Sequence, residues 1–531
     1  MRQTGDCGRN VLILRTILTG CLLLINQLVV CITVHPMDDR ALPRNRTSRE
    51  NMTTTHSPGG TEENPGRIET HSIDVIPESA RHGQPRSLGA VWFVSNLNLT
   101  AMSTGVVIVS LGGTLFWNLI AIVVGSLVGT TFMALHCTQG PHLGLPQMIQ
   151  SRAQFGYAGA AITVFVAVYL NYLTYNTSDA LQSSDAGAIL TGLPLWAGYV
   201  IAAAVAAVIA LFGYDMIHKV NRILVIPTTA VMIMLTIGVF ELDGISAALS
   251  PGNFRLPIFM TAFVITAGFQ LGWAPYVSDY SRYLPASTSS RRMFWWTYVP
   301  SAASAVWVFA IGALAQAGTG AESAVAAFKA AGDALFPGAG TIVIVGLLVG
   351  LLAVMAINQY GGSLTLLSIA DSVRPIRATR KARMTAILVM AAMVWGIAYL
   401  VGADRFNLFY GNALIYLAYL FTPWTAINLV DYFVVRRGHY VVADLFKPSG
   451  GIYGRWGWRG NGVYLVTVAV MVPFMVTSQF VGFAAAWLHN VDYSMLVGLV
   501  VGSALYIVVC KIGAPAEQEP VGDCAAVGVN E

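Results

Sequence analysis

The amino-acid sequence predicts an all-α membrane protein that crosses the bilayer twelve times. The first observation behind this prediction is composition, because the 531 residues are 55% hydrophobic and only 11% charged, with a mean hydropathy of +0.63. Those values exclude an ordinary soluble globular protein. The second observation is a succession of apolar segments of spanning length, and the third is the distribution of arginine and lysine between the loops.

The residues before the first predicted span divide into two parts. Residues 1–51 contain an apolar run from Val11 to Val34, so they are either a signal-like or anchor-like segment or sequence translated upstream of the true start. Residues 52–88 are polar and rich in Thr, Glu, Pro and Gly, which predicts a disordered cytoplasmic tail. Met52 opens this tail and is the alternative start to Met1.

Apolar segments of about 20 residues, the length that crosses a bilayer, then follow one another. The first five fall within residues 89–240 and the next five within residues 257–430. Residues 431–512 hold a cytoplasmic loop and two further spans, and residues 513–531 form a cytoplasmic tail. The predicted spans are Ala90–Val109, Thr114–Cys137, Gly156–Leu181, Pro194–Phe212, Ile223–Phe240, Pro257–Tyr280, Phe294–Ala317, Thr341–Ile357 with a continuation to Ala370, Ala386–Val401, Leu408–Val430, Val463–Phe480 and Met495–Lys511.

Basic residues alternate between crowded and sparse loops, as the positive-inside rule requires of a correct span count. The outer loops hold little beyond Arg255, Lys329 and Arg405. This pattern predicts a multi-pass protein of the cell membrane with both termini in the cytoplasm. The inner loops hold Arg152, Lys219, Arg222, Arg282, Arg291, Arg292, Arg374, Arg377, Arg380, Lys381, Arg383, Arg436, Arg437, Lys447, Arg455 and Arg459.

Two of the predicted spans have interrupted middles. The sixth carries Gly268, Gln270, Gly272, Trp273 and Pro275 in quick succession, which disfavours a continuous helix. The first carries polar and small residues in the same place: Asn96, Asn98, Thr100, Ser103, Thr104 and Gly105.

The spacing of the two interruptions predicts an internal repeat. The second interruption comes five spans after the first, so a five-helix repeat would place its second copy inverted, and the two breaks would meet near the midplane as a substrate site. The alternatives are a proline-kinked helix with an interfacial tryptophan for the sixth span, and packing through small side chains for the first.

Other classes of protein have little support in the sequence. There is no HExxH, GxSxG or Walker motif, so we expect no enzyme activity and no cofactor. The six cysteines form no CxxC pair, which argues against a metal site or a disulfide framework. The basic residues lie in short loops, so no nucleic-acid partner is indicated. A channel would need a filter motif or a pore-lining ring, whereas paired broken helices favour an occluded site.

Several segments resemble the nucleobase–cation symporter-1 family of permeases for cytosine, purines, uracil, allantoin, hydantoins and thiamine. They are IETHSIDVIPESARHGQPRS from Ile68, GPHLGLPQMIQSRAQFGYAG from Gly140, GYDMIHKVNR from Gly213 and GWAPYVSDYSRYLP from Gly272. The resemblance implies the leucine-transporter-like inverted 5+5 repeat plus two C-terminal helices. It implies a symporter that imports a nucleobase or related planar heterocycle by alternating access, and cytosine or a purine is the favoured substrate. The alternatives are allantoin or a hydantoin, uracil, thiamine, or an amino acid or amine.

The resemblance also implies site residues. A planar ring is expected between Tyr172 in span three and Trp273 in span six, where Gly272 leaves the indole face uncovered. The register in span three could instead slip by one turn to Tyr169 or Tyr175. Hydrogen bonds to the ring are expected from Asn176, four residues after Tyr172, and from Asn358 in span eight, although helix packing is an alternative for Asn358. Gln270 and Ser103 are weaker candidates that could simply satisfy unwound backbone.

The expected coupling cation is a proton rather than sodium. Sodium-coupled relatives carry a Ser-Thr pair six and five residues before the span-eight amide, where this chain has Leu352 and Ala353, which offer no side-chain oxygen. A proton requires a titratable group on the path. Asp279, beside Arg282, is expected near a cytoplasmic helix end and Asp179 near the outer face, and solvation or a salt bridge would explain either, so neither is assigned the proton.

Overall fold

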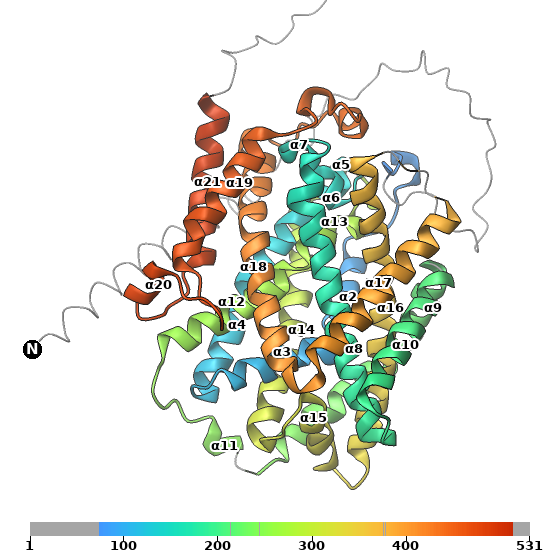
Figure 1. Cartoon of the computed structure of the whole chain (residues 1–531), viewed down its shortest axis with the longest axis vertical. Helices are drawn as coiled ribbons and strands as arrows, with labels where there is room; N and C mark the ends of the chain where they lie inside the picture. The colour runs from blue at the N-terminus through green and yellow to red at the C-terminus, as the bar shows by residue number, and fades with distance from the viewer. Residues whose placement is uncertain (1–73, 213, 244, 375, 377–378, 513–531) are drawn as a thin grey trace, which may run out of the picture.

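The computed structural model describes residues 74–212, 214–243, 245–374, 376 and 379–512 (Figure 1). The predictions for residues 1–73 and 513–531 therefore lie outside the described residues. Within the described ranges the regular structure is helical, apart from an isolated antiparallel bridge between Val476 and Val481. This agrees with the predicted all-α class.

The helices of the first half are α2 (Arg86–Ser95), α3 (Leu99–Ser110), α4 (Leu115–Cys137), α5 (Gln139–Leu143), α6 (Gln147–Gln150), α7 (Arg152–Phe155), α8 (Val166–Thr191), α9 (Leu195–Phe212) and α10 (Tyr214–Phe240). Those of the second half are α11 (Ile245–Ala248), α12 (Leu256–Leu271), α13 (Ala274–Ser281), α14 (Ser290–Thr319), α15 (Ala324–Asp333), α16 (Ala339–Val373), α17 (Arg380–Val401) and α18 (Phe406–Val430). The chain then continues through α19 (Trp458–Met471), α20 (Phe483–Trp487) and α21 (Ser494–Ile512).

Seven of the helical segments in the described residues are each long and apolar enough to cross a membrane, and the bent pair α2 and α3 makes an eighth. The apolar parts of α9 and α10 are shorter, at Leu195–Leu211 and Ile226–Phe240. α19 has only 14 residues and ends where Pro473 follows. The protein is thus a multi-pass helical membrane protein, while the count of twelve stays a prediction.

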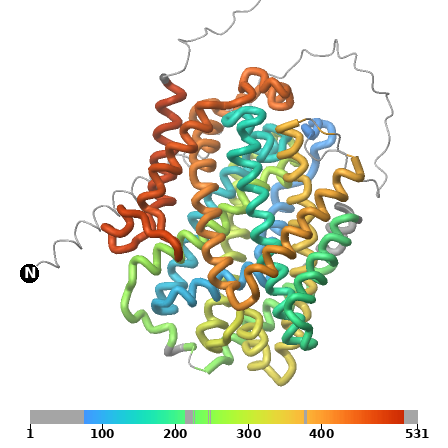
Figure 2. Tube along the Cα trace, viewed as in Figure 1, coloured from blue at the N-terminus to red at the C-terminus, as the bar shows by residue number. Residues whose placement is uncertain are grey.

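The packing between the halves repeats with the roles exchanged. α4, the second span of the first half, packs along α12, which begins the second half. α14, the second span of the second half, packs in turn along α3, which belongs to the first span. In the same way α9 packs on α16 while α17 packs on α8. Figure 2 lets the two halves be followed by colour through this interleaved arrangement. Such exchanged pairs are what two structurally related halves produce.

Glycines permit the close crossing of α3 and α14. A Cβ atom on Gly105 would lie 2.0 Å from the carbonyl oxygen of Phe309, and one on Gly312 would lie 1.9 Å from that of Met102. Small residues let helix backbones approach closely in membranes, where the hydrophobic effect does not drive helices together. Each glycine therefore makes room for the backbone of the opposite helix.

The first predicted break is a real bend. α2 and α3 are inclined by 56°, with three residues between them. Asn98 caps α3 by accepting a hydrogen bond from the N–H of Ala101 at 2.8 Å. Asn96 donates to the carbonyl oxygen of Ser301 at 3.1 Å and to the hydroxyl of Ser304 at 3.0 Å. Asn98 thus satisfies the N-terminal end of α3, and Asn96 connects the break to α14.

The second break is smaller than the sequence suggests. α12 continues through Gly268 and Gln270 to Leu271, and α13 starts at Ala274. Gly272 and Trp273 lie between them with helical φ and ψ angles, so both helices still count as one span. Pro275 falls in the first turn of α13, where its missing N–H costs little.

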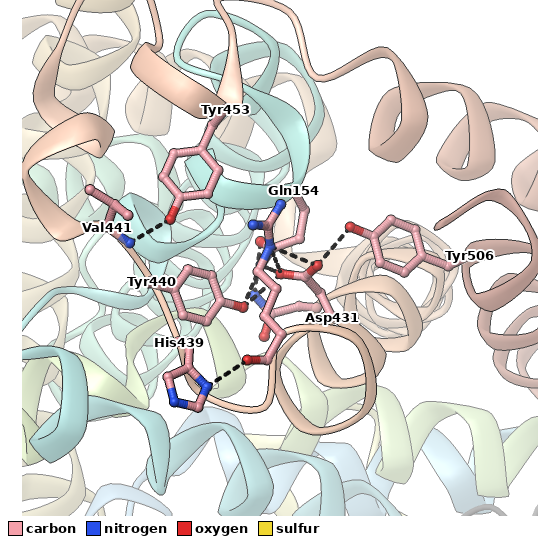
Figure 3. Close-up of polar contacts among 9 residues, drawn as sticks. Gln154, Asp431, His439, Tyr440, Val441, Tyr453 and Tyr506 are labelled. Atoms are coloured by element: carbon pink, nitrogen blue, oxygen red, sulfur yellow. Dashed lines mark hydrogen bonds and ion pairs between the residues drawn. The ribbon is translucent and has the colours of Figure 1, made fainter. Parts of the chain in front are cut away.

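A buried carboxylate ties the C-terminal helices to the rest of the molecule. Asp431, at the end of α18, accepts hydrogen bonds from Gln154 of α7 at 2.6 Å, from Tyr440 at 2.7 Å and from Tyr506 of α21 at 2.9 Å. Arg436 forms an ion pair with it at 3.1 Å. Figure 3 shows Gln154, Tyr440 and Tyr506 converging on Asp431 from separate segments. The SRAQFG segment therefore has a structural role at this end of the helix bundle.

Candidate functional site

A cavity of about 340 Å³ lies where the broken spans meet α8 and α16. Its inner part is bordered by Asn98 and Thr100 beside the first break and by Gly272 and Trp273 at the second. It extends to Ser87 at the start of α2 and to Arg282 and Tyr283 after α13. Two segments about 170 positions apart in the chain thus line one space, as the inverted-repeat hypothesis predicts.

Aromatic rings form much of the cavity wall. The ring centroids of Trp273 and Trp92 are 6.0 Å apart, and those of Trp273 and Tyr276 are 6.5 Å apart, both in edge-on geometry. Tyr276 also contacts Tyr172, with centroids at 4.6 Å. Tyr276 therefore touches both aromatics that were expected to sandwich a ring. Tyr175, one turn after Tyr172, borders the cavity as well and packs edge-on against Phe269.

Four of the seven predicted site residues line this cavity: Trp273, Tyr172, Asn358 and Gly272. The other three are not among its lining residues and bond to neighbouring helices. Asn176 is fully buried against α16, and the amide orientation that satisfies both polar atoms donates to Met355 O at 2.9 Å and accepts from Gln359 N–H at 3.1 Å.

Gln270 and Ser103 bond to neighbouring side chains or backbone. Gln270 donates to the hydroxyl of Thr130 at 2.8 Å, which joins α12 to α4. Ser103 donates to the side-chain oxygen of Gln182 at 2.6 Å and to the carbonyl oxygen of Leu99 at 3.0 Å. These contacts stabilise the helix packing around the breaks. In this conformation both residues therefore hold the surrounding helices together without bordering the cavity.

Asp179 lies in the cavity wall, not near the outer surface where the sequence suggested. It is 1% exposed, and its two oxygens accept hydrogen bonds from Thr100 at 2.5 Å and from Asn358 at 3.5 Å. Gln182 donates to the same Thr100 hydroxyl at 2.9 Å. The buried Asp179 carboxylate thus connects α8 to the first break. It also contacts Asn358 of α16, whose amide is expected to hydrogen-bond the substrate ring.

Asn171 and Tyr276 were also missed by the sequence analysis. The amide of Asn171 donates to Gly272 O at 3.2 Å and to the Tyr276 hydroxyl at 2.7 Å, which satisfies backbone at the second break. Asn171, Tyr175 and Asp179 are spaced four residues apart, which places all three on one face of α8. This spacing is the sequence signal that could have identified Asn171 and Asp179 as residues of the site.

Asp279 lines the cavity near the end that Arg282 and Tyr283 form. It accepts a hydrogen bond from the backbone N–H of Gln147 at 3.2 Å. Ser278 donates to the side-chain oxygen of Gln147 at 2.5 Å. The LPQMIQ and SDYSRYLP segments, which carry much of the family resemblance, therefore contact each other at this end of the cavity.

Comparison with known proteins agrees with this architecture. A family model described as permease for cytosine/purines, uracil, thiamine, allantoin matches residues 75–498. YxlA of Bacillus subtilis, whose name describes a purine-cytosine permease, is 35% identical over 447 residues, which cover 84% of this chain and 96% of YxlA. The purine-cytosine permease fcyB of Emericella nidulans is 24% identical over 400 residues, covering 72% of this chain and 76% of fcyB.

Solved structures confirm the fold. Mhp1, a nucleobase-cation-symport-1 family transporter in a closed conformation with bromovinylhydantoin bound, superposes with a TM-score of 0.64 at 20% identity. The superposition covers 85% of this chain and 95% of Mhp1. The leucine-transporter-like fold is therefore confirmed, and the family consists of membrane permeases. The chain belongs to the family of permeases for cytosine/purines, uracil, thiamine and allantoin.

Proposed function

We propose that this permease is a symporter that imports a nucleobase or related planar heterocycle, cytosine or a purine first, by alternating access and with a proton as the coupling cation. The observation that carries this proposal is the cavity between the two broken spans. At about 340 Å³ it lies near the lower end of the ~300–1,000 Å³ typical of ligand sites, which suits a compact ring.

The chemistry of the wall favours a flat heterocycle. Trp273 and the tyrosines of α8 offer faces for stacking, and Asn358 offers both a donor and an acceptor to a ring edge. An aliphatic amino acid would leave these aromatic faces without a ring to stack on. The curated relatives named as purine-cytosine permeases support cytosine or a purine as the first compounds to test.

The coupling cation is proposed from the side chains of α16. Leu352 and Ala353 lie one to two turns before Asn358 and carry no oxygen with which to bind a hard cation. The cavity holds two carboxyl groups, Asp179 and Asp279, and so provides titratable groups on the transport path. With the loop at Arg282 placed inside by the positive-inside rule, the cavity reaches toward the cytoplasm.

Uptake by membrane vesicles with an imposed pH gradient tests the proposal. Labelled cytosine, adenine, hypoxanthine, uracil, allantoin, thiamine and one aromatic amino acid form the panel. We expect accumulation of a ring compound that a protonophore abolishes and that is unchanged when choline replaces sodium. Accumulation of the amino acid alone would overturn the substrate class, and strict sodium dependence would overturn the assignment based on Leu352 and Ala353.

A further inference from the structure

We propose that Asp179 is the proton-binding residue of this transporter and that its proton is cotransported with the heterocycle. This inference rests on the proposed proton-coupled symport and names the group that performs it. Asp179 is the carboxyl group that lies next to the first break, and it borders the cavity while being almost entirely buried.

The surroundings of Asp179 lack a compensating cation. In the part of the chain that the structure describes, its hydrogen-bond partners are the neutral Thr100 and Asn358, and no Lys, Arg or His side chain forms an ion pair with it. Burial without a counter-ion opposes a permanent negative charge, since a buried ion is costly unless paired. A buried structural acid in this same protein, Asp431, has Arg436 beside it.

Other features stabilise the ionised form, so both protonation states are accessible. Thr100 lies in the first turn of α3, and the N-terminal end of a helix attracts negative charge. Thr100 and Asn358 both donate to the carboxylate. The titratable groups that face it are the phenols of Tyr175 on α8 and Tyr410 on α18, while α3 and α16 present Thr100 and Asn358.

Protonation changes what Asp179 can bind. The ionised carboxylate only accepts hydrogen bonds, whereas the neutral acid carries one O–H that must find an acceptor. The nearby Thr100 hydroxyl already accepts one hydrogen bond from Gln182 and has room for one more. A ring nitrogen or exocyclic oxygen of a heterocycle in the cavity supplies such an acceptor, so proton binding and substrate binding favour each other.

The same contacts give the proton a structural effect. Thr100 belongs to α3, Asp179 to α8 and Asn358 to α16, so this carboxyl group links the first broken span to the two helices opposite it. In the present conformation the cavity leads from Asp179 to Arg282 and Tyr283. Release of the proton and the heterocycle toward that end restores the carboxylate and its two hydrogen bonds.

Proteoliposomes holding the full-length protein test this assignment with Asp179→Asn and Asp179→Glu. The matched control is Asp185→Asn, which makes the same change on the same helix outside the cavity lining. The probes are labelled cytosine and adenine, measured both as accumulation under a pH gradient and as counterflow exchange. One proton per substrate gives the wild type and Asp185→Asn up to about tenfold accumulation per pH unit, because one pH unit is about 1.36 kcal/mol.

We expect Asp179→Asn to lose accumulation and its pH response while retaining counterflow, and Asp179→Glu to recover accumulation with a shifted pH profile. Gradient-driven accumulation by Asp179→Asn would overturn the assignment. Loss of counterflow in both variants would also overturn it, because the amide of Asn and the protonated Glu each keep a donor for the heterocycle, so the loss would point to a structural role of Asp179. In infrared difference spectra between high and low pH, a carboxylic-acid carbonyl band should be missing from Asp179→Asn.

Uptake by the wild-type protein distinguishes a failure of this inference from a failure of the proposed function. A wild type that accumulates the probe under a sodium gradient alone contradicts proton coupling, and with it the role of Asp179. A wild type that takes up neither probe contradicts the proposed substrates, and the infrared band of Asp179 still decides whether this carboxyl group exchanges a proton.

Discussion

Replacing Trp273 by alanine should weaken substrate binding more than the loss of any other single aromatic side chain of the cavity. Trp92 and Tyr276 pack against the indole at interplanar angles of 64° and 80°, so neither ring takes up a parallel-stacked position on Trp273, which borders the cavity. Stacking of a base on an aromatic side chain contributes about 1–3 kcal/mol, and about 1.4 kcal/mol is a factor of ten in affinity. We therefore expect the Kd to rise roughly 5- to 150-fold.

Equilibrium binding of the labelled heterocycle to purified protein measures this change. Trp273→Phe keeps a smaller stacking face and should lose less affinity than Trp273→Ala. Trp196→Ala is the matched control, because this tryptophan is 60% exposed at the start of α9 and away from the cavity lining. An unchanged Kd in folded Trp273→Ala protein would refute the stacking role.

Three further predictions concern the scaffold. Gly312→Ala should sharply reduce the yield of monodisperse protein in size-exclusion chromatography, because the new Cβ would lie 1.9 Å from Met102 O. Gly396→Ala, with open space around it, is the control. Equal yields of the two variants would contradict the close crossing of α3 and α14. Asp431→Asn should lower the thermal midpoint by less than the ~3–5 kcal/mol of a fully buried ion pair, because the Arg436 side chain left without its partner is 31% exposed. An unchanged midpoint would show that Arg436 and the tyrosines need no carboxylate. The side chain of Lys447 and the N–H of Ile452 lower the pKa of Asp444. Its stabilising effect on the loop between α18 and α19 is therefore complete above the unfolded value of about 3.9 and is lost as pH falls through the lower folded value. Hydrogen exchange of this loop should therefore differ between wild type and Asp444→Asn at neutral pH and converge in strong acid, and a difference that disappeared between about pH 5 and 8 would contradict this assignment.

The sequence predicted the parts of the structure that depend on composition and spacing. The all-helical class follows from hydropathy, and the meeting of two interrupted spans follows from the polar Asn98 in the first and the glycine at 272 in the second. Trp273 and Asn358 line the cavity because each lies on a segment whose position the repeat determines.

Composition and spacing could not predict the rotation of α8 about its own axis, which decides which of its side chains face the cavity. Asn176 turns its amide to the backbone of α16, and Tyr175 borders the cavity alongside Tyr172. The helix offers polar and aromatic residues on several faces, and contacts with α16 and α3 decide which of them face the cavity. The depth of Asp179 was misjudged for a different reason, because α8 continues ten residues beyond the predicted end of the span at Leu181.

A structure of the protein with its transported heterocycle bound tests the central claim most directly. We predict a planar ring against the indole of Trp273, with one polar edge within hydrogen-bond distance of Asn358. A ring bound instead in the small cavity beside Asp185 and Glu322 would contradict the account, because that space involves neither broken span.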